Sequence, residues 1–298
     1  MSTIHHRMQP ADARTNPCAG HVRWKASKSF WYLAACVATA GLAPVCITPG
    51  AVLVSFILTA TTLCLGHTLG MHRRLIHQSY ACPLWLERCF VYLGVLVGIA
   101  GPFRIIYLHD IRDWSQRHPD CHPFFRHAHG WWRDFWEQLH CEIALEHPPR
   151  FTLEPRVRED RVYRFLEATW RWQQLPLALV LYLVGGWSWV VWGVGVRLWF
   201  SLTGHWLVGY LAHNRGGRTW HIEGAAVQGF NVPGFALLTM GESWHNNHHA
   251  YPESARLGIG PRQWDVGWWV LSLLRKIGLV WDVVTPATMP ERKERLAL

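Results

Sequence analysis

The sequence has no closely spaced cysteine pairs. Its eight cysteines are spread singly between Cys18 and Cys141, and no two of them form a CxxC motif. Zinc ribbons and thioredoxin-type redox sites both need such pairs, so neither is expected here. Cysteines spread so evenly are typical of small apolar fillers in a reducing compartment.

A compact basic run is also missing, although the chain is basic overall. Its formal net charge is +9 with histidine neutral, and its isoelectric point is about 9.4. Positive charge spread in this way favours an anionic membrane surface, or an acidic partner or substrate, over nucleic acid. We therefore expect no nucleic-acid partner. The polar N-terminal stretch has no apolar segment close behind it, so it does not resemble a secretory signal.

Charged residues are absent from the whole stretch 29–66. One helix of this length would be roughly 57 Å long, almost twice the thickness of the hydrocarbon core of a bilayer. Pro44 and Pro49 interrupt the stretch near its middle. The pattern therefore predicts a helical hairpin with membrane spans near 30–48 and 51–69.

A second apolar stretch covers 173–212, with Arg197 as its one charged residue. The adjacent glycines Gly185–Gly186 are a turn signal inside it. The stretch predicts two more spans, near 172–186 and 188–211.

The chain divides into three parts on this reading. A basic N-terminal segment, 1–28, precedes a membrane domain, 29–283, and a polar tail expected to fray, 284–298. Basic residues flank the predicted hairpins, whose turns are uncharged, so the positive-inside rule predicts that the termini and the segment between the hairpins face the cytoplasm. The apolar run 89–103 is too short to span and predicts an interfacial or buried helix. Residues 109–170, rich in His, Arg and Trp, predict a cytoplasmic cap.

Histidine is plentiful, with 19 copies, and three of them crowd into the stretch "GESWHNNHHAYPES". His245, His248 and His249 are spaced three and four apart, so a helix brings them to nearly the same face. Three imidazoles in contact pack poorly, because each has two polar nitrogens to satisfy. Neutral imidazole is a common ligand of iron, zinc and copper. The cluster therefore predicts a metal site; the alternative is a merely polar surface cluster.

A second pair, His72 and His77 in "HRRLIH", directly follows a predicted span. Their spacing of five places them about 140° apart on a regular helix. That spacing predicts ligands to different metals, or residues on either side of a distorted turn. His67, further upstream, is expected to be a hydrogen-bonding residue at the end of the span.

A third group is His109 and Asp113 in "HDIRDW", four residues apart and so on one helix face. An imidazole and a carboxylate placed in this way can share a metal, and the oxygen ligand suits iron. The alternative is a salt network on a helix surface, formed with Asp110 and Arg112.

A fourth candidate is His213, at the cytoplasmic end of the last predicted span. An ionisable residue in that position is a functional candidate, whereas His205 lies deeper and is expected only to form hydrogen bonds. A catalytic zinc uses three protein ligands and a structural zinc four, so seven histidines predict two metals. A two-metal, histidine-rich site at a membrane surface suits dioxygen activation. The candidate ligands are His72, His77, His109, His213, His245, His248 and His249, with Asp113 as a further one.

These residues resemble the membrane-bound fatty acid desaturases of the acyl-CoA desaturase type. "GMHRRLIHQSY" is similar to the first histidine box of that family and "GESWHNNHHAYPES" to the third. "RLWFSLTGHWLVGYLAHN" is similar to the segment that carries a lone extra ligand, here His213. The resemblance extends from about residue 30 to residue 283, where "IGLVWDVVTP" is similar to the C-terminal end of the family. It implies an all-α, multi-pass membrane protein, with four transmembrane helices in two hairpins and a cytoplasmic helical cap around a histidine-rich di-iron site.

The second histidine box departs from the family. The usual pattern is HRxHH, whereas this chain has HDIRD, so His109 matches the first histidine while Arg112 and Asp113 stand at the other two positions. Arginine cannot bind a metal, whereas a carboxylate can. Gly209 stands where the family has an asparagine that approaches the metal through water. We interpret the chain as a subfamily with altered ligation; the alternative is an activity other than simple desaturation.

The resemblance implies an O2-dependent reaction. Two irons supply the oxidant, hydrogen is removed from two adjacent methylenes of an acyl chain, and a cis double bond results, while the protein positions the chain. The substrate is expected as a thioester of CoA or a carrier protein, or as a lipid. Arg73, Arg74 and Arg112 are candidate contacts for an acidic headgroup on charge alone. No haem- or flavin-binding segment is visible, so a separate electron donor is expected, a ferredoxin or small cytochrome.

Other functions stay open at this level. A hydroxylase or acetylenase on the same scaffold differs in how the substrate is placed. A haem protein would need histidines that face each other within the spans, whereas these clusters lie at span ends. A non-catalytic metal- or lipid-binding membrane protein fits if the altered second box has lost iron.

Overall fold

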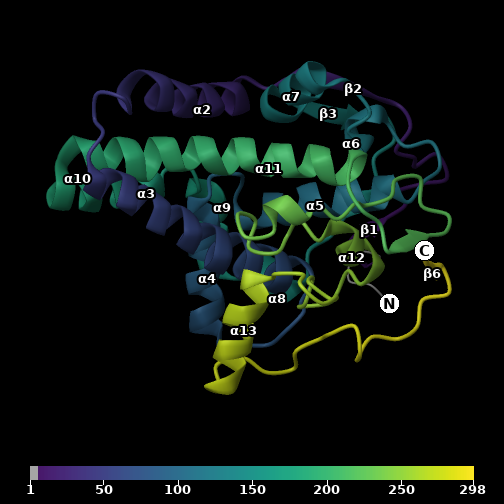
Figure 1. Ribbon diagram of the computed structural model, residues 1–298. Helices are drawn as coiled ribbons and strands as arrows, with labels where there is room; N and C mark the ends of the chain where they lie inside the picture. The colour runs from purple at the N-terminus through teal and green to yellow at the C-terminus, as the bar shows by residue number, and fades with distance from the viewer. Residues whose placement is uncertain (1–5) are drawn as a thin grey trace.

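The computed structural model describes residues 6–298, and the chain within these bounds is mostly helical. Residues 1–5 of the predicted N-terminal segment lie outside the described residues. The long helix α11 (Arg197–Asn214) has α2 (Ala26–Val37) and α3 (Pro49–Thr61) packed against it, and α10 (Gln174–Val190) lies at the end where α11 begins (Figure 1).

The functional residues are brought together at the opposite end of α11. There α5 (Pro102–Gln116) and α12 (His245–Ala250) lie near its last turn (Figure 1). The other helical segments are η1 (Ala38–Leu42), η2 (Thr62–Ile76), α4 (Leu84–Leu96), α6 (Pro123–Arg126), α7 (Trp131–His140), α8 (Pro155–Arg158), α9 (Arg161–Thr169), η3 (Val191–Val196), η4 (Pro233–Phe235) and α13 (Val266–Lys276).

Two helices are long and apolar enough to cross a membrane, judged by length and composition: Pro49–Ile76 with 28 residues and Gln174–Asn214 with 41. The first contains the predicted span 51–69. The second contains the predicted span 188–211 and all but the first two residues of the predicted span 172–186. Gly186 interrupts it with φ 65° and ψ −161°, a conformation that glycine adopts without steric cost. The break coincides with the predicted Gly185–Gly186 turn.

The helical segment observed in the predicted first span, 30–48, is shorter than that span. Helical structure there ends at Leu42, the last residue of η1, and α3 begins only at Pro49. Its surface is nevertheless apolar, since Phe30 and Val45 are both exposed. Exposed apolar side chains continue on α3 and α10, and a contiguous apolar surface of this kind suits contact with lipid. The protein is therefore membrane-associated.

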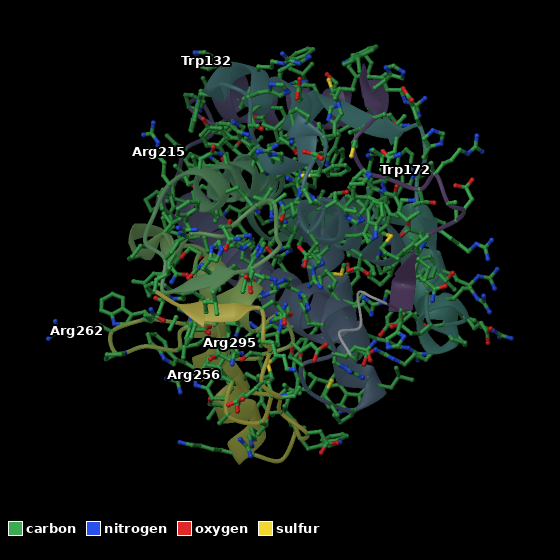
Figure 2. The ribbon with its side chains drawn as sticks, turned by 90° about the vertical axis from the view of Figure 1, so that its right-hand side faces the viewer. Trp132, Trp172, Arg215, Arg256, Arg262 and Arg295 are labelled. Atoms are coloured by element: carbon green, nitrogen blue, oxygen red, sulfur yellow. The ribbon has the colours of Figure 1, made fainter. Side chains whose placement is uncertain are left out.

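Tryptophans lie at the margin of the cap. Trp132 and Trp172 are 79% and 68% exposed, and Trp132 lies at the edge of the molecule in Figure 2. Exposed indoles of this kind are typical of the boundary between membrane and water. Their placement fits the predicted cap at headgroup level.

Helix α4 packs directly on η2 because two glycines of η2 leave room for it. A Cβ on Gly66 would lie 2.3 Å from backbone atoms of Leu93 and Gly94, and a Cβ on Gly70 would lie 2.6 Å from the carbonyl group of Phe90. The apolar run 89–103 thus begins within a buried helix, one of the two alternatives predicted for it.

Short strands correct the all-α expectation. The described residues contain three antiparallel pairs, each joining segments far apart in the sequence. Strands of two to five residues are too short to show the alternation by which a strand is recognised in a sequence. The pairs are β1 (Met8–Gln9) with β4 (Arg150–Phe151), β2 (Gly20–Trp24) with β3 (Cys141–Leu145), and β5 (Trp220–Ile222) with β6 (Arg295–Ala297).

The C-terminal tail was expected to fray, but it is bound to the rest of the molecule. Besides the pairing of β6, the guanidinium of Arg295 lies 4.1 Å from the centre of the Tyr251 ring. Arg292 donates a hydrogen bond of 3.2 Å to the backbone carbonyl of His249. The tail is therefore in contact with the helix that carries the third histidine group.

Candidate metal centre

Helix α12 carries the third histidine group and is held in place by an asparagine between the histidines. The side-chain oxygen of Asn246 accepts hydrogen bonds from the backbone N–H groups of Thr219 and Trp220. Its amide nitrogen donates to the carbonyls of Trp220 and Gly229. Asn246 and its neighbour Asn247 are both buried. The polar residues of "HNNHH" thus have two roles, since the asparagines anchor the short helix and the histidines form the site.

His72 and His77 lie in a widened helical turn. The backbone N–H of His77 bonds at 3.0 Å to the carbonyl of His72, five residues earlier, as in a π-helix. Such a turn holds more residues than an α-helical turn, so side chains five apart come to the same side. Their ring centres are only 4.7 Å apart. The expectation that they serve different metals does not fit this geometry, whereas the alternative of a distorted turn does.

Four imidazoles converge at the end of η2, and we call them the four-histidine cluster. They are His72 and His77 of η2, His109 of α5 and His248 of α12. One ring nitrogen of each lies within 4.8 Å of the others, and the Nε2 atoms of His77 and His109 are 3.2 Å apart. A metal about 2.1 Å from each nitrogen requires separations of this order.

The three-histidine cluster lies beside it. Its members are His213 at the end of α11, and His245 and His249 of α12. The Nε2 atom of His245 is 3.2 Å from that of His213 and 3.0 Å from that of His249. The ring centres of His245 and His248 are 5.7 Å apart, so the two clusters adjoin across α12.

Hydrogen bonds fix how two of these rings are turned. Nδ1 of His213 donates at 2.7 Å to the carbonyl of Gly209, and Nδ1 of His109 donates at 3.1 Å to the carboxylate of Asp110. In both rings this leaves Nε2 unprotonated when the imidazole is neutral. A ligand whose outer nitrogen is held in this way is oriented for a metal on its inner side.

The protonation states also suit a metal. Burial holds the pKa of His77, His245 and His248 well below its usual value, so these rings are neutral near pH 7. In addition, Nδ1 of His77 and of His248 is buried without a hydrogen-bond partner among the described residues. Neutral imidazoles that crowd together in this way are a donor set that suits iron and similar ions. The residues present therefore fit a nitrogen-bound metal centre.

Asp113 lies next to both clusters. Burial acts to raise the pKa of its carboxyl group, but the neighbouring His109, His249 and His248 hold that pKa below its usual value. Asp113 and His249 also line the same small pocket. The side chain is thus a carboxylate close to the histidines, although its oxygens are not among the ligand atoms that lie within 4.8 Å of one another in either cluster.

The three arginines expected to meet a headgroup are turned inward. Arg73 is 1% exposed, and its nitrogens donate to the carbonyl of Ala255 and to the carboxylates of Asp265 and Glu242. Each side-chain nitrogen of Arg73 thus has a partner inside the protein. The expectation that Arg73 contacts a substrate headgroup, which was based on charge alone, does not fit this arrangement.

The other two arginines also have internal partners. Arg74 forms an ion pair of 2.6 Å with the buried Glu87. Arg112 donates to His127 and Gln138. By contrast, Arg215 and Arg262 are exposed and reach outward at the edge of the molecule (Figure 2).

Two further residues of the site were not predicted. Oε2 of Glu242 lies 2.6 Å from Nδ1 of His72. The ring of His127 stacks on that of His213, with centres 5.2 Å apart and an angle of 19° between the planes. Glu242 stands within the third histidine stretch, three residues before His245, where an acidic residue is a usable signal. His127 belongs to no motif, and nothing in the sequence indicates its position.

His67 and His205 also lie close to the site. Their ring centres are 5.3 Å apart, edge to face, and His67 stacks at 6.4 Å on His72. Neither ring forms a hydrogen bond within the described part of the chain, which differs from the hydrogen-bonding roles expected of them.

Comparison with known proteins shows relatives over most of the chain, although no family model matches it. An sn-1 stearoyl-lipid 9-desaturase from Anabaena variabilis is 37% identical over 223 residues, which are 74% of this chain and 78% of the relative. A protein of the same name from Synechocystis sp. (strain ATCC 27184 / PCC 6803 / Kazusa) is 35% identical over 79% of this chain and 72% of its own length. An acyl-CoA C20 Delta5-desaturase from Anemone leveillei is 33% identical over 80% and 76%, respectively.

Because more than two thirds of each of these relatives is matched, the likeness covers far more than the histidine motifs. Their names also agree with a membrane-associated protein whose imidazole-lined site suits iron, with an acyl or lipid substrate and with oxygen. The chain belongs to the fatty acid desaturase family, and it is an oxidoreductase that introduces a double bond into a fatty acyl chain.

Proposed function

We propose that the protein is a di-iron desaturase that forms a cis double bond with O2 as oxidant. The observation that carries this proposal is the meeting of seven imidazoles from η2, α5, α11 and α12 in two adjoining clusters. A single ion does not need so many nitrogen ligands. The assignment of the metal as iron comes from the family.

The proposed ligands divide between the two clusters. One iron takes the four-histidine cluster. The other takes the three-histidine cluster together with the carboxylate of Asp113, which suits iron because iron accepts both nitrogen and oxygen ligands. The proposed set is His72, His77, His109 and His248 for the first iron, and His213, His245, His249 and Asp113 for the second.

The proposed reaction requires electrons and protons at the site in addition to the acyl chain and O2. An acyl chain loses two hydrogen atoms and O2 becomes two molecules of water, which requires two further electrons and two protons. The iron pair, when bound, supplies the oxidising power that acid–base groups lack. The protein orients the ligands through Gly209, Asp110 and Glu242, and it holds the acyl chain. We propose a ferredoxin or a small cytochrome as the separate electron donor.

The proposal includes a topology. The apolar hairpins 30–48 with 51–69 and 172–186 with 188–211 cross the membrane four times, with the termini and the histidine clusters on the cytoplasmic side. Support comes from the two long apolar helices, the break at Gly186 and the exposed apolar surface. Reporter fusions at both termini and at the Gly186 turn test it, and a cytoplasmic signal from that turn would contradict it.

The substrate is proposed as an acyl thioester of CoA or a carrier protein, or an acyl lipid. Relatives of both kinds occur, since two are stearoyl-lipid desaturases and one is an acyl-CoA desaturase. A hydroxylase or acetylenase is the alternative activity, because Arg112, Asp113 and Gly209 depart from the family pattern and such a change at the metal can alter the product.

Expression in a host that lacks desaturase activity tests the proposal. We expect a new monounsaturated acyl chain, identified by mass analysis with double-bond mapping, and no product from the His248→Ala variant, because His248 lies in the four-histidine cluster. His221→Ala, a change outside both clusters, is the control. A hydroxylated or acetylenic product would favour the alternative, and product from His248→Ala would contradict the metal assignment.

Asp113→Ala tests the second iron separately. We expect weaker binding of the second iron and loss of turnover, because the three-histidine cluster alone offers only three protein ligands. Two irons and unchanged turnover in this variant would remove Asp113 from the ligand set. Asp113→His, which restores a histidine at this position of the second box, is the matched comparison.

A further inference from the structure

Arg112 stands at a position where the family has a metal-binding histidine. Its guanidinium group donates hydrogen bonds to acceptors inside the protein. Its Nη1 atom donates at 2.5 Å to Nε2 of His127, and its Nη2 atom donates at 2.8 Å to the side-chain oxygen of Gln138. A guanidinium in the interior needs acceptors of this kind, because its desolvation is otherwise costly. Arg112 is also the immediate neighbour of Asp113 on α5.

His127 is held from its other side by a buried carboxylate. Nδ1 of His127 donates at 3.0 Å to Asp134, and Asp134 also accepts a hydrogen bond of 2.8 Å from the indole nitrogen of Trp206. With Nδ1 protonated, Nε2 is the acceptor for Arg112, so both ring nitrogens have partners. Burial, followed by the charge of Arg112, holds the pKa of His127 well below its usual value, in agreement with a neutral ring.

The ring of His127 lies against the helix that carries His213. It stacks on His213, and the backbone carbonyl of His127 accepts a hydrogen bond of 3.1 Å from Asn214. A Cβ on Gly209 would lie 3.7 Å from Nε2 of His127, which is contact distance. The backbone of α11 at Gly209 therefore lies next to the His127 ring.

These contacts make His127 the link between α5 and α11, the two helices that carry Asp113 and His213. We infer that Arg112, His127 and Asp134 form one positioning unit that holds Asp113 and His213 in place for the metal of the three-histidine cluster. In a regular second box, two histidines fix the position of their helix by binding the metal. Here the unit fixes α5 by hydrogen bonds and ring stacking. Replacing two neutral histidines by an arginine and an aspartate also leaves the net charge unchanged. The inference rests on the two-metal function proposed above.

Cobalt binding to the purified, metal-free, full-length protein in detergent tests the inference without using activity. We expect the wild-type chain to bind two Co²⁺ ions, which are distinguishable by their visible absorption. In His127→Ala the first ion should bind as in the wild type, while the second should bind about 10- to 100-fold more weakly, the usual effect of losing an outer support of a metal ligand. Arg112→Ala should have the same effect. The double variant should be no worse than either single one, because residues that act as a unit are not additive.

His129→Ala is the matched control. His129 is two residues further on in the same loop, with its Nε2 atom 3.6 Å from Glu137, and it belongs to neither cluster. Both ions should bind to this variant as to the wild type. His127→Gln keeps an acceptor for Arg112 and should recover part of the affinity, so it decides the question if His127→Ala fails to fold.

The outcomes separate this inference from the proposed function. Unchanged affinity for the second ion in His127→Ala and His127→Gln would overturn the inference. Equal weakening of both ions in a variant with wild-type helical content would overturn it as well, since the unit would then support the whole centre. A wild-type chain that binds fewer than two ions would instead contradict the two-metal function, whatever the His127 variants do.

Discussion

At the scale of single residues, Glu242 supports a candidate ligand from outside the metal centre. Its Oε2 atom lies 2.6 Å from Nδ1 of His72, and Arg73 contacts its other oxygen at 3.4 Å. Burial acts to raise the pKa of Glu242, but His72 and Arg73 lower it to about 2, so the group is a carboxylate near neutral pH. A carboxylate behind a metal-bound histidine orients the ring and makes it a stronger donor.

The change Glu242→Gln is therefore expected to weaken the metal of the four-histidine cluster by about 10- to 100-fold. The amide still reaches His72 but carries no negative charge. Metal titration of the purified protein measures the effect, with the exposed Glu223→Gln as control. If the Glu242→Gln variant binds the metal as tightly as the wild type, the carboxylate of Glu242 acts only in its ion pair with Arg73.

At the scale of elements, the contact between η2 and α4 places two candidate ligands. Gly66 and Gly70 allow the backbones to touch, and η2 then continues into the widened turn that carries His72 and His77. A side chain at Gly66 would separate the two helices, because its Cβ would lie 2.3 Å from backbone atoms that cannot move aside as a flexible side chain can.

We expect Gly66→Ala to destabilise the protein by about 1–3 kcal/mol, the usual cost of overpacking a close contact. A Cβ on Gly41, which also lies in a helical segment, meets nothing within 4 Å, so Gly41→Ala is the matched control and should be neutral or slightly stabilising. Thermal unfolding in detergent compares them. Equal midpoints for the two variants would mean that α4 shifts at no cost.

The sequence shows some elements clearly and hides others for physical reasons. Long apolar stretches and the Gly185–Gly186 turn were sufficient to locate the two long apolar helices, whereas helical structure in the predicted span 30–48 ends early, at Leu42. The spacing of His72 and His77 was misleading, because a regular helix has 3.6 residues per turn and the observed turn is wider. The strand pairs and the bound tail depend on contacts between distant segments, which no local pattern records.

At the scale of the whole molecule, the metal centre is a place where the fold crowds neutral imidazoles together. Burial holds the pKa of His77, His127, His245 and His248 well below the usual value of 6.5. In the unfolded chain these groups regain ordinary pKa values. Below about pH 6.5 the unfolded state therefore binds more protons than the folded state, and the free energy of unfolding falls as the pH falls. His109 acts in the opposite sense: although burial opposes it, Asp113 and Asp110 raise the pKa of His109, so its contribution is present below pH 6.5 and is lost as the pH rises through the raised pKa.

The four histidines with a lowered pKa outweigh the one histidine with a raised pKa. We therefore expect the metal-free protein to lose thermal stability steadily from pH 7 to pH 5.5. Each lowered histidine contributes up to about 1.4 kcal/mol per pH unit below its unfolded pKa. Bound metal should raise the unfolding midpoint at every pH, because it binds the folded site, and the gain should shrink toward pH 5.5 as protons compete for the same nitrogens. Thermal scans in detergent with and without Co²⁺ measure both trends. A metal-free midpoint that stays constant or rises as the pH falls would show that the imidazoles are open to water, which contradicts a buried site assembled from η2, α5, α11 and α12.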